Sequence, residues 1–219
     1  MAKLVIFGAG EIAELAHFYF TSDSEHEVVA FTVDKAFRKE DRFQGLPLVD
    51  FEEVTEHYSP EEYTMFVALS YVKMNQVRAE KYQNAKALGY PIASYVSSRC
   101  TYLSEIPCGE NCFILENNTI QPFVTIGNNV TLWSGNHIGH GSTLEDHVNV
   151  TSHVVISGNC RIGSYSFIGV NATLRNSINV APHTLIGAGA ILMHDTKEKE
   201  VYLPQRATLF DKTSDEVEL

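Results

Sequence analysis

The sequence predicts two folds in series: an α/β domain built on a parallel sheet, then a parallel β-helix built from hexapeptide repeats. Up to about residue 97, short apolar runs alternate with amphipathic segments in a strand–helix–strand order, which implies parallel pairing. From about residue 100 the helical periodicity ends, and an aliphatic residue recurs at every sixth position. We therefore expect a first domain over 1–97, a β-helix over 98–195, and a terminal strand with an acidic tail over 196–219.

The elements of the first domain follow from the apolar pattern. We expect strands at 3–8, 26–34, 63–69 and 91–96, a turn and strand at 45–48, and helices at 11–20, 51–57 and 74–88. Their order is that of a small Rossmann-like sheet domain.

The repeat of the second half is unbroken over fourteen hexads. The second position is often Gly, and the fifth favours small or β-branched residues, which suit tight corners. Three hexads form an 18-residue triangular coil, so about five coils run from residue 102 to 193 and bury one another's faces. The first position is aliphatic throughout: Ile114, Ile120, Ile126, Leu132, Ile138, Leu144, Val150, Ile156, Ile162, Ile168, Leu174, Val180, Ile186 and Leu192.

A glycine-rich turn follows the first expected strand and precedes the first expected helix. Gly8, Ala9 and Gly10 fit the pattern whose glycines let backbone amides and a helix N-terminus approach phosphate. Asp34, which closes the second strand, is placed to accept hydrogen bonds from a ribose or a base. The sheet is half a dinucleotide fold, so a mononucleotide or nucleotide sugar fits best. The alternatives are a tight turn that binds no ligand and an Asp34 that only caps a helix or forms a turn.

Histidines are concentrated in the β-helix, with five of the nine in the chain lying between residues 137 and 183. None occupies an inward aliphatic position, which argues against a role as core filler. A neutral imidazole is suited to take a proton from an attacking amine or alcohol. For any single one of them, the alternative is a surface histidine that stacks on the next coil.

Composition and charge narrow the function classes. The chain of 219 residues is 44% hydrophobic and 20% charged, and its formal net charge of −11 disfavours binding to nucleic acid or anionic lipid. No apolar run is long enough to cross a bilayer, and the N-terminus enters a strand without a cleavable signal, so we expect a cytoplasmic protein. The four cysteines lack CxxC spacing and are expected to be reduced packing residues rather than a metal site.

A Rossmann-like half joined to hexads of the form Ile-Gly-x-x-Ser/Ala/Val-x resembles the acyl-CoA-dependent sugar acyltransferases. This family includes the bacillosamine-pathway N-acetyltransferases, which act on UDP- or dTDP-linked 4-amino sugars, and the sialic-acid O-acetyltransferases. The resemblance implies a left-handed β-helix, a homotrimer, a nucleotide sugar held by the N-terminal domain, and acetyl-CoA or another short acyl-CoA in the cleft between subunits. Ile138-Gly139-His140 matches the family's Ile-x-His hexad, which implies that His140 is the general base of a direct transfer.

The same resemblance implies roles for further residues, which occupy the matching hexad positions of this chain. It places Asn149 near the acyl carbonyl, as a catalytic and CoA-binding residue, and places Gly158, Val170 and Ala188 along the pantetheine arm. Gly141 stands where the family has an acidic residue that orients the histidine. We expect another group to hold the ring, and the candidates are His137, His153, Asn136 and Glu145.

Two further departures concern the substrates. Glu11 lies in the glycine turn, where it is unfavourable beside a phosphate, and Tyr202-Leu203-Pro204-Gln205 replaces the family's closing Gly-x-Pro-Ala segment. Zinc is a weaker alternative: β-helix proteins similar to γ-class carbonic anhydrases carry a histidine pair five residues apart, whereas successive gaps here are three, seven and six. We predict no metal.

The sequence therefore predicts an enzyme that acylates the amino group of a nucleotide-linked sugar. Transfer to a hydroxyl is the alternative within the family. A non-catalytic, nucleotide-binding trimeric scaffold is the alternative from another class.

Overall fold

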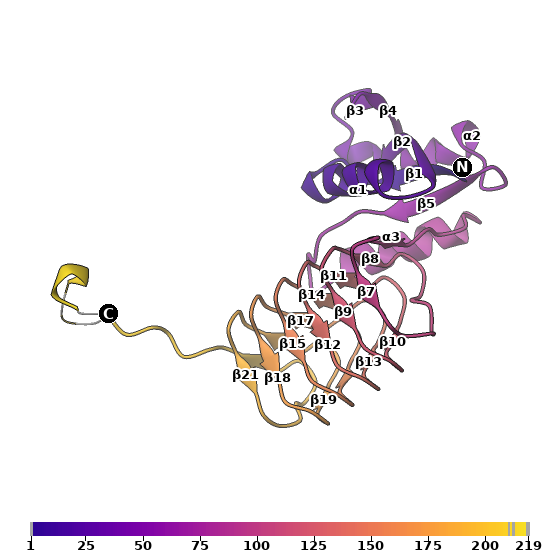
Figure 1. The fold of residues 1–219 in the computed structure, drawn as a ribbon. Coiled ribbons are helices and arrows are strands. Elements are labelled where there is room, and N and C mark those ends of the chain that lie inside the picture. Colours follow the sequence, from indigo (N-terminus) through magenta and orange to yellow (C-terminus); the bar gives the residue numbers. More distant parts are fainter. Residues whose placement is uncertain (1, 210, 212, 218–219) are drawn as a thin grey trace.

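The computed structural model describes residues 2–209, 211 and 213–217, and it contains the two expected parts (Figure 1). The first part is a five-stranded sheet in the order β3-β4-β2-β1-β5. β1 pairs in parallel with β2 and β5, β2 pairs in parallel with β4, and only β3 is antiparallel to its neighbour. The strands are β1 (Ala2–Phe7), β2 (His26–Val33), β3 (Arg42–Phe43), β4 (Leu46–Asp50) and β5 (Tyr63–Val67).

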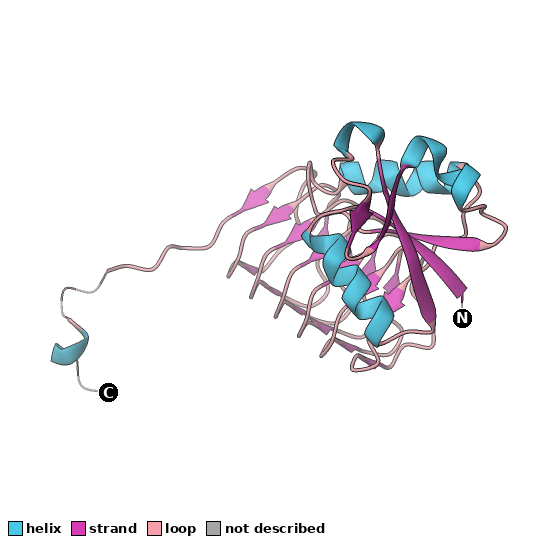
Figure 2. Cartoon of the chain, turned by 90° about the horizontal axis from the view of Figure 1, so that it is seen from above, coloured by secondary structure: helices cyan, strands magenta, loops and turns pink. Residues whose placement is uncertain are grey.

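Helices cover both faces of this sheet (Figure 2). α1 (Glu11–Ser22) packs on one face through Ala13, Ala16 and Phe20, and α2 (Val54–His57) and α3 (Gln76–Ala87) pack on the other. The helix expected over 51–57 is a 3₁₀ turn, Phe51–Glu53, followed by the single turn of α2. α3 begins two residues later than predicted because Asn75 adopts a left-handed conformation, φ 64°, that a helix interior excludes.

The strand predicted at 91–96 is divided between the two parts. Ile92 forms only a bridge to Met65 at the edge of the first sheet, and β6 (Tyr95–Val96) pairs with β8 of the β-helix. The prediction of one strand is therefore wrong, because the chain leaves the first sheet after Ala93 and joins the second.

The second part is a three-sided prism of stacked two-residue strands. All fourteen repeated aliphatic residues are at most 2% exposed and form its core, as predicted. The first face holds β6, β8 (Phe113–Ile114), β11 (Thr131–Leu132), β14 (Asn149–Val150), β17 (Phe167–Ile168), β20 (Leu185–Ile186) and β22 (Val201–Tyr202). The second face holds β7 (Thr101–Tyr102), β9 (Thr119–Ile120), β12 (His137–Ile138), β15 (Val155–Ile156), β18 (Thr173–Leu174) and β21 (Ile191–Leu192). The third face holds β10 (Thr125–Ile126), β13 (Thr143–Leu144), β16 (Arg161–Ile162) and β19 (Asn179–Val180).

The corners of the prism depend on the fourth hexad position, which the sequence analysis did not single out. That residue has a positive φ in all of the fourteen hexads but the last, for example 57° at Asn129, 64° at Gly141 and 65° at His147. Asn, Gly and His tolerate this conformation better than most residues. The small residues at the fifth position fill the inside of each corner, as expected; Val130, Ser142 and Val148 are fully buried.

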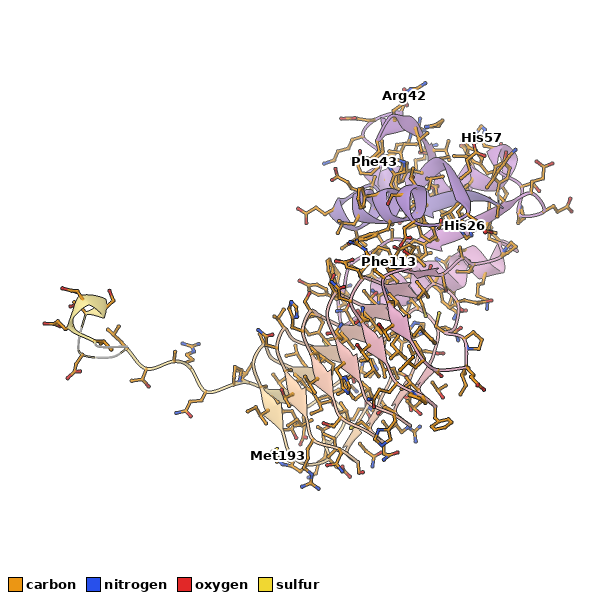
Figure 3. The ribbon with its side chains drawn as sticks, in the orientation of Figure 1. His26, Arg42, Phe43, His57, Phe113 and Met193 are labelled. Carbon is orange, nitrogen blue, oxygen red and sulfur yellow. The ribbon has the colours of Figure 1, made fainter. Side chains whose placement is uncertain are left out.

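The N-terminal domain packs on the first face between β8 and β17. Arg78 of α3 donates to Thr131 Oγ1 at 2.7 Å and to the Asn129 carbonyl at 3.1 Å, and Tyr71 packs on Phe167 with ring centres 4.9 Å apart. Phe113 lies at the junction of the two parts, within the α1 core (Figure 3). The two parts therefore share a continuous buried layer.

The C-terminal segment continues the first face and then leaves it. β22 pairs in parallel with β20, which confirms a strand at Val201–Tyr202, and residues 203–209 are exposed as the chain runs away from the β-helix (Figure 1). The described residues include no helix with the length and apolar character needed to span a membrane.

Candidate active site

The glycine turn lies at the carboxyl ends of β1 and β5. Gly8 has φ +132°, and a Cβ there would stand 2.6 Å from the Ala68 carbonyl oxygen, so only glycine fits. Gly10 is the extended N-cap residue of α1, and nothing lies within 4 Å of a Cβ built on it. The first glycine is thus needed for packing, whereas the second leaves the N-terminus of α1 open to a ligand.

Two adjoining cavities open at this edge of the sheet. The first, which we call the Asp34 cavity, measures about 310 Å³ and holds the predicted Gly8, Ala9 and Asp34 together. The Asp34 carboxylate is paired with Lys81 Nζ at 2.8 Å, and the Phe37 ring at the rim is 72% exposed. Its lining residues are Phe7, Gly8, Ala9, Val33, Asp34, Phe37, Leu69, Val77 and Lys81.

The second, the Trp133 cavity, measures about 560 Å³ and combines residues of both parts of the chain. Gly10 and Glu11 of the α1 N-terminus face Tyr71 and Trp133, so aromatic rings and a carboxylate line one space. Sequence spacing did not identify Trp133, Tyr71 or Lys81, because they come together only when the two parts pack. The lining residues are Gly10, Glu11, Ile12, Ala68, Leu69, Ser70, Tyr71 and Trp133.

His140 lies at the corner between the second and third faces, where its side chain is exposed. Gln121 Oε1 accepts the His140 backbone N–H at 2.8 Å and lies 3.2 Å from the ring atom Nδ1. The ring lies against Gly158 of the next coil, since a Cβ at that position would stand 2.6 Å from Cε1 and 2.8 Å from Nε2. The 18-residue period could have indicated Gln121, because it lies one coil below Gly139.

Three of the groups expected to hold the His140 ring, Asn136, His153 and Glu145, have contacts elsewhere. The Asn136 amide oxygen accepts the Val154 N–H at 2.7 Å, and His153 lies over Gly135 at the corner between the first and second faces. Glu145 binds Arg161 and Ser164; burial raises its pKa, but these hydrogen bonds hold the pKa below the usual value. Gln121, and none of these three side chains, lies within hydrogen-bond distance of the His140 ring.

Two of the clustered histidines belong to a ladder at the corner between the third and first faces. The ladder runs through the left-handed positions Asn111, Asn129, His147, Tyr165 and His183. Asn129 Nδ2 lies 2.9 Å from His147 Nδ1, and the rings of Tyr165 and His183 stack at 4.7 Å. His147 and His183 therefore stack on neighbouring coils, which is the alternative to a catalytic role. His137 lies on the second face, in β12.

The predicted CoA contacts do not share one surface of a single chain. Asn149 is only 1% exposed, on the first face between Thr131 and Phe167, which Arg78 and Tyr71 of the N-terminal domain contact. This burial disagrees with a contact between Asn149 and an acyl group. Gly158 lies against the His140 ring from the next coil, whereas Val170 and Ala188 are exposed at the corner between the first and second faces.

Among the described residues, no three His, Cys, Asp or Glu side chains converge as a metal-ligand set would. All four cysteines are free thiols, and Cys112 and Cys160 are buried in the β-helix core, in agreement with the prediction of packing residues.

Comparison with known proteins supports the fold over nearly the whole chain. A model of the family "Bacterial transferase hexapeptide (six repeats)" matches residues 108–140, and no curated protein matches the sequence. The acetyltransferase domain of PglB from Neisseria gonorrhoeae FA1090, also solved with acetyl coenzyme A, is 23% identical, with a TM-score of 0.77 over 92% of this chain and 96% of that one. PerB from Caulobacter crescentus, in complex with CoA and GDP-perosamine, is 18% identical, with a TM-score of 0.79 over 92% and 93%.

A third solved structure, WeeI from Acinetobacter baumannii AYE, is 16% identical, with a TM-score of 0.73 over 91% of this chain and 93% of that one. The repeat model and these structures confirm the resemblance to hexapeptide-repeat sugar acetyltransferases. The predicted fold, a Rossmann-like domain followed by a left-handed parallel β-helix, is likewise confirmed.

Proposed function

We propose that the protein transfers an acetyl or related short acyl group from acyl-CoA to the amino group of a nucleotide-linked sugar, with His140 as the general base. The observation that carries the proposal is an exposed imidazole that is held at one nitrogen and seated on a glycine, in a chain whose other domain has a cavity at a helix N-terminus. Related structures bind CoA or acetyl-CoA and, in PerB, GDP-perosamine.

The proposed reaction needs no acyl-enzyme. The sugar amine attacks the thioester carbonyl, the new C–N bond forms, the C–S bond breaks, and CoA leaves as a thiolate. His140 Nε2 takes the proton that the amine loses and passes it to the thiolate, which gives the amide and free CoA thiol. Backbone amides of the corner stabilise the developing oxyanion.

The two domains divide the substrates between them. Residues 1–97 are proposed to hold the nucleotide sugar, with the base and ribose in the Asp34 cavity and the sugar toward Trp133. The β-helix, 98–195, is proposed to hold acyl-CoA, and 196–219 to continue it as a strand and tail. Glu11 disfavours a phosphate beside it, so the diphosphate is placed toward Gly8 and Ala9 rather than over the side chain of Glu11.

A homotrimer is proposed because one chain does not bring these parts together. The Trp133 cavity lies beside the corner between the first and second faces, whereas His140 is exposed one corner further on. Strand β12 separates them. In a closed threefold ring, each site combines the cavity of one subunit with His140 of the next, and Val170 and Ala188 of one chain lie near Gly158 of its neighbour.

The acceptor is tested with purified protein, acetyl-CoA and a panel of UDP-, dTDP- and GDP-linked 4-amino and 4-hydroxy sugars. Release of CoA thiol and the product mass are measured for wild type, His140→Ala and the control His57→Ala, which changes an exposed histidine far from the corner. We expect one added acetyl group on an amino sugar with wild type and control, and none with His140→Ala. Product on hydroxy sugars alone would assign O-acetylation, and no product with any sugar would favour the scaffold.

A further inference from the structure

The contact between His140 and Gln121 determines which ring nitrogen carries the proton. The Gln121 atom Oε1 makes two contacts with His140. It accepts the backbone N–H at 2.8 Å, and it lies within hydrogen-bond distance of the ring atom Nδ1, at 3.2 Å. A backbone N–H only donates, so the Gln121 atom that receives it is the amide oxygen and not the amide nitrogen. An amide oxygen only accepts, so Nδ1 of the neutral ring must carry the hydrogen.

We infer that Gln121 is a positioning residue, which holds His140 in the Nδ1–H tautomer and thereby presents Nε2 as the proton acceptor. The inference rests on the proposed function of His140 as base, although the tautomer itself does not. Gly158 contributes because it has no side chain, so the face of the ring can pack against its backbone. A side chain there would overlap Cε1 and Nε2. Gln121 fixes one edge of the ring, and the opposite edge remains open to a substrate.

Gln121 does this without charge. An acidic partner in the same place would hold the same tautomer but would also stabilise the imidazolium after proton transfer. The turns of the two adjacent coils beside His140 provide Gln121, Pro122, Gly158 and Asn159, none of which titrates. The titratable side chains on the flanking strands of its coil are His137 on β12 and Glu145 after β13, and Glu145 is already paired with Arg161.

Two substitutions separate the hydrogen bond from the charge. Gln121→Met keeps the length of the side chain and removes the acceptor, whereas Gln121→Glu keeps an acceptor oxygen and adds a negative charge. Gln83→Met is the matched control, because Gln83 is exposed on α3, away from the corner. Melting temperatures of all three variants establish that the fold is retained.

The tautomer is measured first, without substrate, from the ¹⁵N chemical shifts of histidine-labelled protein by solid-state NMR. The His140 signals are assigned as those missing from His140→Gln. We expect a protonated Nδ1 and an unprotonated Nε2 in wild type and Gln83→Met, and a mixture of tautomers in Gln121→Met. A wild-type proton on Nε2, or a Gln121→Met spectrum identical to wild type, would overturn the inference.

Kinetics then test the consequence for catalysis. Gln121→Met should lower kcat by roughly 10- to 100-fold and leave both KM values within about threefold. Gln121→Glu should restore kcat to within about threefold of wild type and move the acid limb of the rate profile up by roughly one pH unit. An unchanged kcat in Gln121→Met would contradict the role. Absence of any transfer by wild type, together with the expected tautomer, would reject the proposed function and not the Gln121 contact.

Discussion

At the residue scale, two uncharged neighbours determine how His140 lies. Gln121 binds one edge of the ring, and Gly158 leaves space for its face. Glycine at 158 is not required by its backbone, because its φ lies outside the left-handed region. The requirement comes from the ring alone, and an exposed ring is free to rotate away if that space is filled.

Gly158→Ala tests this requirement. The added methyl would stand 2.6 Å from the ring, so His140 should leave Gln121 and kcat should fall about tenfold or more. The melting temperature should stay within about 3 °C, because the displaced side chain is exposed. Asn176→Ala, at the equivalent position one coil further on, is the control. Full activity in Gly158→Ala would show that the ring does not need this seat.

At the element scale, the corner ladder explains why histidine is frequent in this β-helix. Its five positions need a residue that accepts a left-handed backbone and can stack on the coil below, and Asn and His meet both needs. His147 is 7% exposed, and its ring lies 4.6 Å from that of Tyr165. Local hexad position predicted that it avoids the core, but not that it is buried from the other side by α3.

The ladder predicts a pH dependence of stability. Burial lowers the pKa of His147 below its ordinary value of 6.5, with Asp146 raising it and Arg78 lowering it further. Since the unfolded chain then binds the proton more readily, the stabilising contribution is complete above pH 6.5 and is lost as the pH falls below it.

The measurement is the melting temperature of wild type and His147→Asn from pH 7.5 to pH 5. Asn occupies the same corner position in two other coils of the ladder, so the variant should fold. We expect a smaller loss of melting temperature in acid for His147→Asn than for wild type. Some loss should remain, because burial also lowers the pKa of His17 and His26. An equal loss in both proteins would contradict the assignment.

At the scale of the whole molecule, the sequence predicts the contacts that recur in every coil. It does not predict the contacts that form when the two halves of the chain pack together. The hexad period identified the fourteen inward aliphatic residues because each coil meets the same packing requirement. It did not reveal that Asn149 is buried where the two halves pack, or that Trp133 and Glu11 line one cavity, because both features depend on how the halves meet. His140 was found from its hexad, but its partner Gln121 requires stacking of two coils.

Subunit mixing tests whether the site is shared between chains. Gly10→Trp should block the Trp133 cavity without disturbing the backbone, because Gly10 is extended and its Cβ direction is open. Neither this variant nor His140→Ala should be active alone. Trimers co-assembled from equal amounts should regain about a quarter of wild-type activity, since each site draws its cavity and its base from different chains. No recovery would place both in one chain.

His140 is proposed to act on the chemical step rather than on substrate binding. The most direct measurement compares His140→Asn with wild type, by calorimetric binding of CoA and of the accepted nucleotide sugar, and by product formation from acetyl-CoA. We predict dissociation constants within about threefold of wild type and product formation reduced by about a hundredfold or more. Undiminished product formation in His140→Asn would contradict a role of His140 as base, and a wild-type protein that binds neither CoA nor acetyl-CoA would contradict acyl transfer.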